Sequence, residues 1–437
     1  MISMKKTIYF AAVGSVAALA APAYADTVSN RIETNELAGT PTFWGTEVTF
    51  SPFPGDLRPQ VTALSDGTFA IVWERDGVDI VGRHFDALGG FTGGDFLSAL
   101  SSSAARPIFL PKIFEQADGR VVVNYTAEVA SGNRDIRWHS PNPTFTPPHS
   151  SSFGTESTQT NGTVSDDILL DSIARVGGGA ANVYQFTAFG STDLVLRFTD
   201  AIGNQASNRT FVGPAGENQQ NPALAARHTG FVNVAFENVN PTTFERDIRL
   251  QTYAPNEMDV PPGEVTASAS GVGASFPDIA ALRGASQQLL GPFVVAWQQT
   301  GGIAFRHFNG NANPITPPLL VPSSSPGLLP KITALNDPGF IIAWTGIVGT
   351  ESDGSPDLEV FLQRFDEDGN TIGTRVQIDK PGDQGLFGMS IATLDDGRVI
   401  LAYESETGDS ANITTLNYRI FLVPAATIIS SAVKTAR

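Results

Sequence analysis

The chain has 437 residues, a formal net charge of −17 and no cysteine. The missing cysteines exclude a disulfide framework, and the acidic balance argues against nucleic-acid binding, which requires a basic face. The length is large for one globular core and suits either two domains or a repeat architecture. With 43 glycines, 29 prolines and no long helical periodicity after residue 25, the composition predicts an all-β protein.

Residues 1–25 have the organisation of a signal peptide. Lys5 and Lys6 precede an apolar run over residues 7–20, and Ala23-Tyr24-Ala25 has the small-x-small form that signal peptidase cleaves. We therefore expect cleavage after Ala25 and a periplasmic or secreted protein. The apolar run is too short to span a bilayer, and no stretch of 18 apolar residues follows, so no membrane span is expected.

A unit of 51 to 60 residues recurs seven times after this segment. Its first strand contains an aliphatic residue beside Ala, Ser or Thr, at Val61, Ile113, Ile173, Leu224, Ile279, Ile332 and Ile391. A glycine turn such as "SDG" follows, since glycine supplies the positive φ of a tight hairpin. A regular period of this length is the mark of a repeat protein.

The rest of each unit predicts three more strands. The second ends on an aromatic residue, namely Trp73, Tyr125, Tyr184, Phe236, Trp297, Trp344 or Tyr403. The third carries an arginine, namely Arg83, Arg137, Arg197, Arg249, Arg306, Arg364 or Arg419. Another turn, such as "DALGG" or "DEDGN", leads to a shorter fourth strand. Small residues on the first strand suit a crowded centre, and the aromatic residues suit the wider gaps between blades.

Seven four-stranded units predict a seven-bladed β-propeller that occupies residues 26–424, with residues 425–437 as a C-terminal tail. The seventh unit lacks a fourth strand, and residues 41–50 resemble the fourth strand of unit six. We therefore expect this N-terminal strand to complete the last blade and close the ring. The alternative, a pair of β-sandwiches, would not keep one period with an arginine in every unit.

The motif "P-x-V-x-A-L-x-D-G-x-F-x-I-V-W" followed by "R-x-F-D-x-x-G" resembles the propeller-type repeats of large secreted bacterial proteins that carry haemolysin-type calcium-binding repeats. The resemblance extends over residues 59–421 and is strongest in units one and six, where "QRFDEDGNTIG" occurs. It implies the fold and export. The nonapeptide calcium repeats, with their "GGxGxD" pattern, are absent here, so the resemblance brings no metal site and no activity.

The repeated arginine has two readings. As packing, its stem would lie along apolar surface and its guanidinium would bind a backbone carbonyl or an acidic neighbour. As a functional group, a ring of seven cations would bind an anionic substrate. A residue required in every blade favours the packing interpretation.

The histidines do not form a recognisable metal site. His84 and His307 occupy the same place in units one and five, which are not adjacent, whereas His139, His149 and His228 are expected in loops or turns. The segment 139–162, rich in proline and serine, is also expected to be a loop. "DEDGN", residues 366–370, is read as a hairpin turn rather than a calcium loop, because the ligand series and distal glutamate are missing.

The segments between the second and third strands are acidic, and in a propeller they emerge on one face. One interpretation is a solvated acidic surface without a binding role. The other is a face that binds divalent cations or a basic or hydroxyl-rich partner. The residues predicted to bind there are Glu74, Asp76, Asp79, Glu351, Asp353, Asp357, Glu404, Glu406 and Asp409.

These patterns favour a non-enzymatic binding module whose ligand is a glycan or a protein. We expect a monomer without a cofactor, calcium being the one ion that the acidic face would suit. The alternative is a carbohydrate-active enzyme, a lyase or hydrolase that uses carboxylates such as Glu351 or Asp353 with an arginine or histidine. No "GxSxG" elbow, "HExxH" helix or phosphate-binding glycine loop is present.

Overall fold

The computed structural model describes residues 39–424 except 54, 93–95, 100–106, 131–132, 142–152, 159–165, 189–190, 207–209, 257, 284–290, 325, 351–353, 379–382 and 408–412. Every regular element within these ranges is a β-strand. The expected signal peptide and C-terminal tail lie outside the described residues. In the described part of the chain there is no helix long and apolar enough to cross a membrane.

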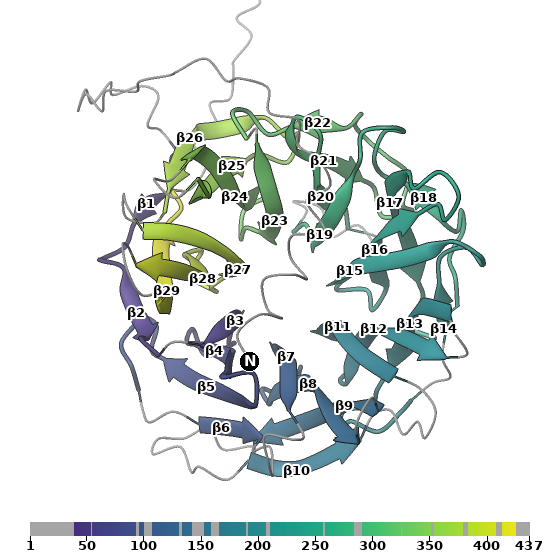
Figure 1. Cartoon of the computed structure of the whole chain (residues 1–437), viewed down its shortest axis with the longest axis horizontal. Helices are drawn as coiled ribbons and strands as arrows, with labels where there is room; N and C mark the ends of the chain where they lie inside the picture. The colour runs from purple at the N-terminus through teal and green to yellow at the C-terminus, as the bar shows by residue number, and fades with distance from the viewer. Residues whose placement is uncertain are drawn as a thin grey trace, which may run out of the picture. The chain divides into compact units, whose positions relative to one another are not determined.

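Seven small antiparallel sheets are arranged in a ring, as the sequence predicted (Figure 1). Blade one contains β3 (Leu57–Ala63), β4 (Phe69–Arg75), β5 (Asp79–Phe85) and β6 (Phe96–Ala99), and blade two contains β7 (Ile108–Glu115), β8 (Val121–Ala130), β9 (Asn133–Pro141) and β10 (Phe153–Thr158). Blade three contains β11 (Asp166–Ala174), β12 (Ala180–Ala188), β13 (Ser191–Phe198) and β14 (Thr210–Val212), and blade four contains β15 (Asn218–Ala226), β16 (Val232–Val239), β17 (Arg246–Tyr253) and β18 (Val265–Thr266).

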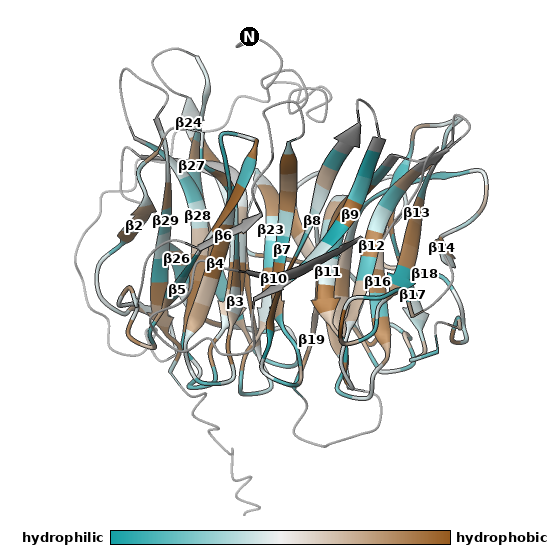
Figure 2. Cartoon of the chain, turned by 90° about the horizontal axis from the view of Figure 1, so that it is seen from below, coloured by the Kyte–Doolittle hydropathy of each residue, from teal (hydrophilic) through white to brown (hydrophobic). Residues whose placement is uncertain are grey.

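Blade five contains β19 (Ser275–Ala281), β20 (Phe293–Gln299), β21 (Gly302–Phe308) and β22 (Leu319–Leu320), and blade six contains β23 (Gly327–Ala334), β24 (Phe340–Thr350), β25 (Pro356–Phe365) and β26 (Thr371–Gln377). Blade seven contains β27 (Asp383–Thr393), β28 (Val399–Thr407) and β29 (Ile413–Leu422). The first strand of each blade lies innermost, and the strands run between two opposite faces where the connections gather (Figures 1 and 2).

The N-terminal part of the chain completes blade seven, which confirms the expected closure. The strands β1 (Thr42–Phe43) and β2 (Val48–Ser51) both pair antiparallel with β29, Thr42 opposite Leu422 and Val48 opposite Tyr418. The last blade thus has no open outer edge on β29, which removes a site for pairing with another chain.

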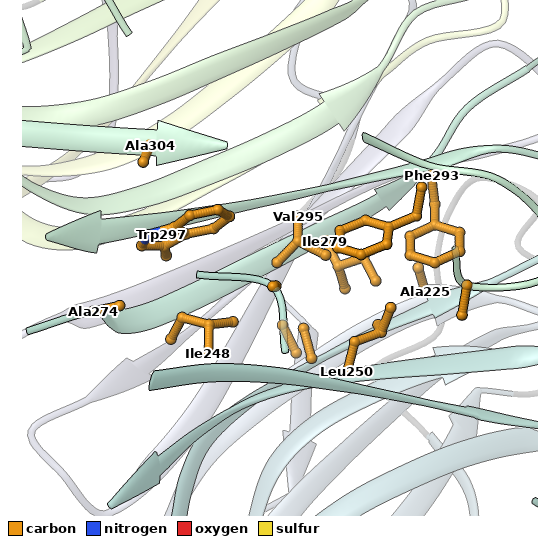
Figure 3. Packing of buried hydrophobic residues seen from close by; sticks show 14 residues of the cluster. Ala225, Ile248, Leu250, Ala274, Ile279, Phe293, Val295, Trp297 and Ala304 are labelled. Carbon is orange, nitrogen blue, oxygen red and sulfur yellow. The ribbon is translucent and has the colours of Figure 1, made fainter. Parts of the chain in front are cut away.

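The core lies between the blades. Each second-strand aromatic residue is fully or almost fully buried, and the interface between blades four and five shows the pattern (Figure 3): Ile248 and Leu250 of β17 pack against Phe293, Val295 and Trp297 of β20. Burial of one such side chain contributes about 1.5–3 kcal/mol. Because every blade is covered on both faces by its neighbours, the ring is stabilised as one unit.

The seven arginines do not form one ring, which corrects the idea of a single repeated position. Arg83, Arg197, Arg306 and Arg419 each lie opposite the residue two before the second-strand aromatic residue, at Ile71, Asn182, Val295 and Leu401. Arg364 lies opposite Ile341, three before Trp344. Since side chains alternate between faces of a strand, this shift of one residue turns Arg364 to the other face of its blade.

Arg137 and Arg249 deviate in another way, because they lie directly opposite the aromatic residues Tyr125 and Phe236. The contacts nevertheless support the packing interpretation. Arg306 donates to the carbonyl oxygens of Thr316 (2.8 Å) and Ala267 (3.2 Å), and Arg249 binds the Glu264 carboxylate at 2.6 Å.

The segment 139–162 is not one loop, contrary to expectation. His139 lies on β9, and β10 forms the fourth strand of blade two within this segment. The prolines of this segment precede β10, whose sequence FGTEST contains none, so the composition of the whole segment obscured a strand near its end. The remainder, residues 142–152 and 159–162, lies outside the described residues.

The seam of the closed ring depends on one buried carboxylate. Asp56 is 0% exposed, and its Oδ2 accepts hydrogen bonds from the Trp73 indole (2.7 Å) and from the Ser51 hydroxyl of β2. Arg75 lies 3.4 Å from the same oxygen. Asp56 thereby joins the closing strand to the core of blade one.

We predict that Asp56→Ala lowers the free energy of unfolding by about 3 kcal/mol, because it removes a buried partner of Arg75, Trp73 and Ser51. Urea unfolding followed by tryptophan fluorescence measures the loss. The matched control, Asp395→Ala at an exposed turn residue, should change the stability by less than about 0.5 kcal/mol. Equal effects of the two variants would contradict this role.

Candidate functional site

Every innermost strand carries a bulge near its start. The register shifts lie between Leu57/Gln60, Phe109/Lys112, Leu169/Asp171, Gln220/Ala223, Ser275/Asp278, Leu328/Lys331 and Gly385/Met389. At five of them a residue other than glycine has a positive φ: Arg58, Leu110, Asn221, Phe276 and Leu329. A bulge releases an N–H group from its own ladder, so that it needs another acceptor.

Side chains of the preceding blade supply that acceptor. Glu404 Oε1 accepts from the Arg58 N–H (2.6 Å), and Glu74 Oε1 accepts from the Leu110 N–H (2.7 Å). The other three such bonds join Leu169 to Thr126 (2.9 Å), Phe276 to Glu237 (3.3 Å) and Leu329 to Gln298 (3.2 Å). The acceptor always follows the second-strand aromatic residue. We call these five bonds the inter-blade clamp.

Two residues predicted to bind a ligand therefore lie in this clamp. Glu74 is 2% exposed and Glu404 is 7% exposed. Arg58 joins them, because its guanidinium binds Glu74 at 2.8 Å while its N–H binds Glu404. Burial raises the pKa of Glu404, the Glu74 charge acts in the same direction, and Arg58 and the Gly388 N–H oppose the shift. An arginine between two carboxylates is the described cluster that comes nearest to an acid–base pair.

Glu237 shows that the same position serves structure in another blade. It is 0% exposed and accepts hydrogen bonds from the Gln220 and Asn221 side chains, while Arg246 lies 2.9 Å from Oε1. All its acceptor capacity is used within blade four and at the Phe276 N–H of blade five.

A second set of side chains, polar in six of the seven blades, lies on the innermost strands opposite the residue that precedes each second-strand aromatic residue. We call it the inner ring: Gln60, Lys112, Asp171, Ala223, Asp278, Lys331 and Ser390. Lys112 Nζ lies 3.6 Å from Asp171 and 3.4 Å from the Gln60 side-chain oxygen. Burial lowers the pKa of Lys112 and raises that of Asp278.

Members of the inner ring also join successive blades. Asp171 accepts the Leu224 N–H at 2.8 Å, Asp278 accepts the Ile332 N–H at 2.8 Å, and Ser390 accepts the Val61 N–H at 3.1 Å. The two lysines and two aspartates of the inner ring balance in formal charge.

The other four described residues of the predicted binding set lie on blades six, seven and one, which are consecutive in the ring. Asp76 lies in the β4–β5 turn of blade one and Asp79 begins β5. Asp357 is the second residue of β25 of blade six, and Glu406 lies near the end of β28 of blade seven. Asp76 is exposed and the other three are half-buried. We call these four residues the acidic arc. Glu351, Asp353 and Asp409 belong to connections in the same blades but lie outside the described residues.

The structure describes no cluster of three or more His, Asp or Glu side chains that could hold a metal within the ranges given above. The 366–370 segment is a turn, as predicted: Asp366 Oδ1 accepts the N–H groups of Asp368 (3.0 Å) and Asn370 (2.8 Å). The Asn370 side-chain amide donates to Asp366 Oδ2 (3.0 Å), so both carboxylate oxygens of Asp366 are engaged within the turn.

Two histidines occupy matching positions, as predicted. His84 lies opposite Ala70 and His307 opposite Val294, each three residues before the second-strand tryptophan. His139 lies elsewhere, opposite Val123, and burial lowers its pKa to about 4.

Sequence reasoning missed the inter-blade clamp. A signal for it exists, because the residue after the aromatic is Glu, Thr or Gln in "WE", "YT", "FE", "WQ" and "YE". Its significance depends on the bulge in the next blade, and a bulge leaves no spacing mark that differs from an ordinary strand.

The fold is shared with known structures at low sequence identity. A protein of unknown function from Dyadobacter fermentans matches with a TM-score of 0.52 and 10% identity over 89% of this chain and 100% of its own. The polysaccharide lyase Uly1 matches with a TM-score of 0.51 and 8% identity over 87% of this chain and 100% of its own. The Penicillium chrysogenum alpha-L-arabinanase complexed with arabinobiose matches with a TM-score of 0.45 and 11% identity over 86% of this chain and 98% of its own.

At these identities the likeness shows a common propeller fold. No family model matches the chain. No curated protein matches it either.

We predict that Glu237→Ala lowers the free energy of unfolding by about 3 kcal/mol, because it leaves the Phe276 N–H and the Gln220 and Asn221 side-chain amides without their acceptor. Chemical unfolding measures this change. Glu245→Ala, at an exposed residue in the next connection, serves as the control and should cost less than about 0.5 kcal/mol. A loss below 1 kcal/mol for Glu237→Ala would contradict the clamp.

A second prediction concerns pH. Since the folded-state pKa of Glu404 is raised from its ordinary 4.5, this residue's contribution is fully present below that value and is lost as pH rises through the folded-state pKa. The stability difference between the wild-type protein and Glu404→Gln should therefore shift in favour of the wild type as pH falls from 7 towards 4.5. If the free energies of unfolding of the two proteins change by the same amount over this pH range, the prediction is wrong.

Proposed function

We propose that this protein is an exported binding module and that its acidic arc contacts a hydroxyl-rich glycan. The observation that carries the proposal is the placement of Asp76, Asp79, Asp357 and Glu406 on three consecutive blades at the same ends of their strands. Loops at one face of a rigid scaffold are the usual place for binding residues. Export rests on the signal-peptide pattern of residues 1–25.

Binding is favoured over catalysis by the state of the buried carboxylates. Glycoside hydrolysis needs two carboxyl groups about 5–10 Å apart that both reach the substrate. Glu74, Glu237 and Glu404 instead accept hydrogen bonds from backbone N–H groups of the next blade. A group that holds two blades together cannot move to a substrate without loosening the ring.

A glycan suits the arc because carboxylates accept hydrogen bonds from hydroxyl groups and repel polyanions. A basic partner would also be attracted, but its affinity would fall steeply with salt, whereas hydroxyl binding would not. The polysaccharide lyase Uly1 shares the fold and sets a precedent for a carbohydrate ligand.

A carbohydrate-active enzyme is the second candidate. It is favoured by one observation, the raised pKa of Glu404 beside Glu74 and Arg58. A carboxyl group whose pKa is raised above its ordinary value is the kind of group that serves as a general acid.

Glycan binding can be measured on immobilised neutral arabinan and galactan, basic chitosan and anionic alginate. We predict binding to a neutral glycan that varies little between low and high salt and weakens at least about tenfold in the quadruple variant Asp76→Asn, Asp79→Asn, Asp357→Asn and Glu406→Gln. Asp395→Asn, at the opposite strand ends, is the control and should bind as the wild type does. Binding to alginate alone, or equal binding by both variants, would refute the proposal.

The same glycans distinguish the second candidate. Release of reducing ends or of unsaturated products that Glu404→Gln abolishes would identify an enzyme and overturn the binding-module proposal.

A further inference from the structure

A cavity of about 200 Å³ lies between blades five and six at the ends of the strands opposite to the acidic arc. Arg283 and Pro292 of the β19–β20 connection, His307 and Ile315 line one part of it. Glu367 and Asp368, in the turn after β25, line the other. The charged groups stand beside apolar walls, which is the composition of small-molecule sites.

His307 is the unusual member of this lining. His307 is 2% exposed, and neither of its ring nitrogens, Nδ1 and Nε2, has a hydrogen-bond partner among the residues that the structure describes. A buried polar group without a partner costs about 1–3 kcal/mol, so the native state needs a reason to keep it.

Blade one shows the same histidine with its partners. Thr68 Oγ1 lies 2.8 Å from His84 Nε2, and Thr92 Oγ1 lies 2.7 Å from Nδ1. The corresponding positions in blade five hold Pro292, just before β20, and Ile315, whose N–H binds the His307 carbonyl as that of Thr92 binds His84. Blade five thus keeps the imidazole and lacks both hydroxyl groups that would satisfy it.

The ring of His307 is held in place. Its centroid lies 5.7 Å from that of Phe305 and 5.3 Å from that of Phe340. Gly369 covers its Cε1 so closely that a Cβ at 369 would lie 2.8 Å from that atom. Burial lowers the pKa of His307 although Asp366 and Asp368 oppose the shift, so the ring is neutral at pH 7 and offers one donor and one acceptor.

We propose that this cavity binds a compact, neutral, hydroxylated ligand, a single sugar ring, through His307. A hydroxyl group both donates and accepts, as the two ring nitrogens require. A cationic ligand would face Arg283, and an anionic one would face Glu367 and Asp368, whereas hydroxyl groups can bond to all three. The apolar side chains of Pro292 and Ile315 suit the C–H face of a sugar. The site is independent of the acidic arc.

The test uses the whole protein with ¹⁵N-labelled histidine and D-glucose, D-galactose, L-arabinose or N-acetyl-D-glucosamine at concentrations up to about 100 mM. We expect at least one sugar to shift the His307 ring resonances and leave those of His84 unchanged. His307→Phe should weaken this sugar's binding at least about tenfold, measured by calorimetry, and leave the melting temperature unchanged or higher.

Two matched variants separate binding from structure. The double substitution Pro292→Thr and Ile315→Thr supplies the hydroxyl groups that His84 has, so it should raise the melting temperature and weaken sugar binding. His84→Phe should lower the melting temperature and leave sugar binding intact.

The proposal is overturned if none of the four sugars shifts the His307 resonances, or if methylammonium or acetate binds there instead. It is also overturned if the double threonine variant binds sugar as the wild type does, a result that remains informative even where His307→Phe fails to fold.

Discussion

The ring depends on a backbone N–H group that leaves its own sheet and binds the blade behind it. Side-chain packing between blades is broad and tolerant, since apolar faces of similar shape can slide or exchange. A hydrogen bond from Leu110 to Glu74, or from Phe276 to Glu237, fixes one blade against the next at a defined distance. Such bonds are directional and lie in a dry environment, where losing one partner is costly.

This constraint gives a structural role to several charged side chains near the axis. The carboxylates of Asp171 and Asp278 accept N–H groups of the following blade in the inner ring, as Glu74 and Glu404 do at the bulges. These four carboxylates, two on innermost strands and two on second strands, hold neighbouring blades together. The residues that we propose to contact other molecules lie at the two ends of the strands.

The sequence was sufficient to predict the seven blades, the innermost first strands and the closure by residues 41–50. These follow from a period, a turn motif and a strand pattern, all of which are local signals. The face on which a side chain lies was harder to predict, as Arg364 shows. One additional residue between the aromatic residue and the arginine reverses the face of the arginine, and the sequence spacing alone does not reveal which strand contains it.

The candidate sites were less accessible to prediction. Glu74 and Asp76 look alike as acids near a turn, yet one is 2% exposed and bound while the other is exposed, because the next blade covers only one of them. His84 and His307 both lie in an Arg-His-Phe sequence, and the residues eight positions later and across the hairpin decide whether the imidazole has hydroxyl partners. Contacts between blades and between hairpin strands decide which of these side chains are engaged within the fold, and one unit read by itself does not contain them.

The closed ring also has a consequence for how the chain acquires its shape. The Thr49 hydroxyl binds the Asn417 side chain at 2.7 Å, although 368 positions separate the two residues. Chains fold from the N-terminus as they emerge, so β2 must wait, without its partner, until nearly the whole polypeptide has been delivered. During that interval the protein is an open crescent with two unpaired edges. For a chain threaded through a membrane, the last step of folding would therefore coincide with the end of transport, and a chaperone that shields strand edges would act before that moment.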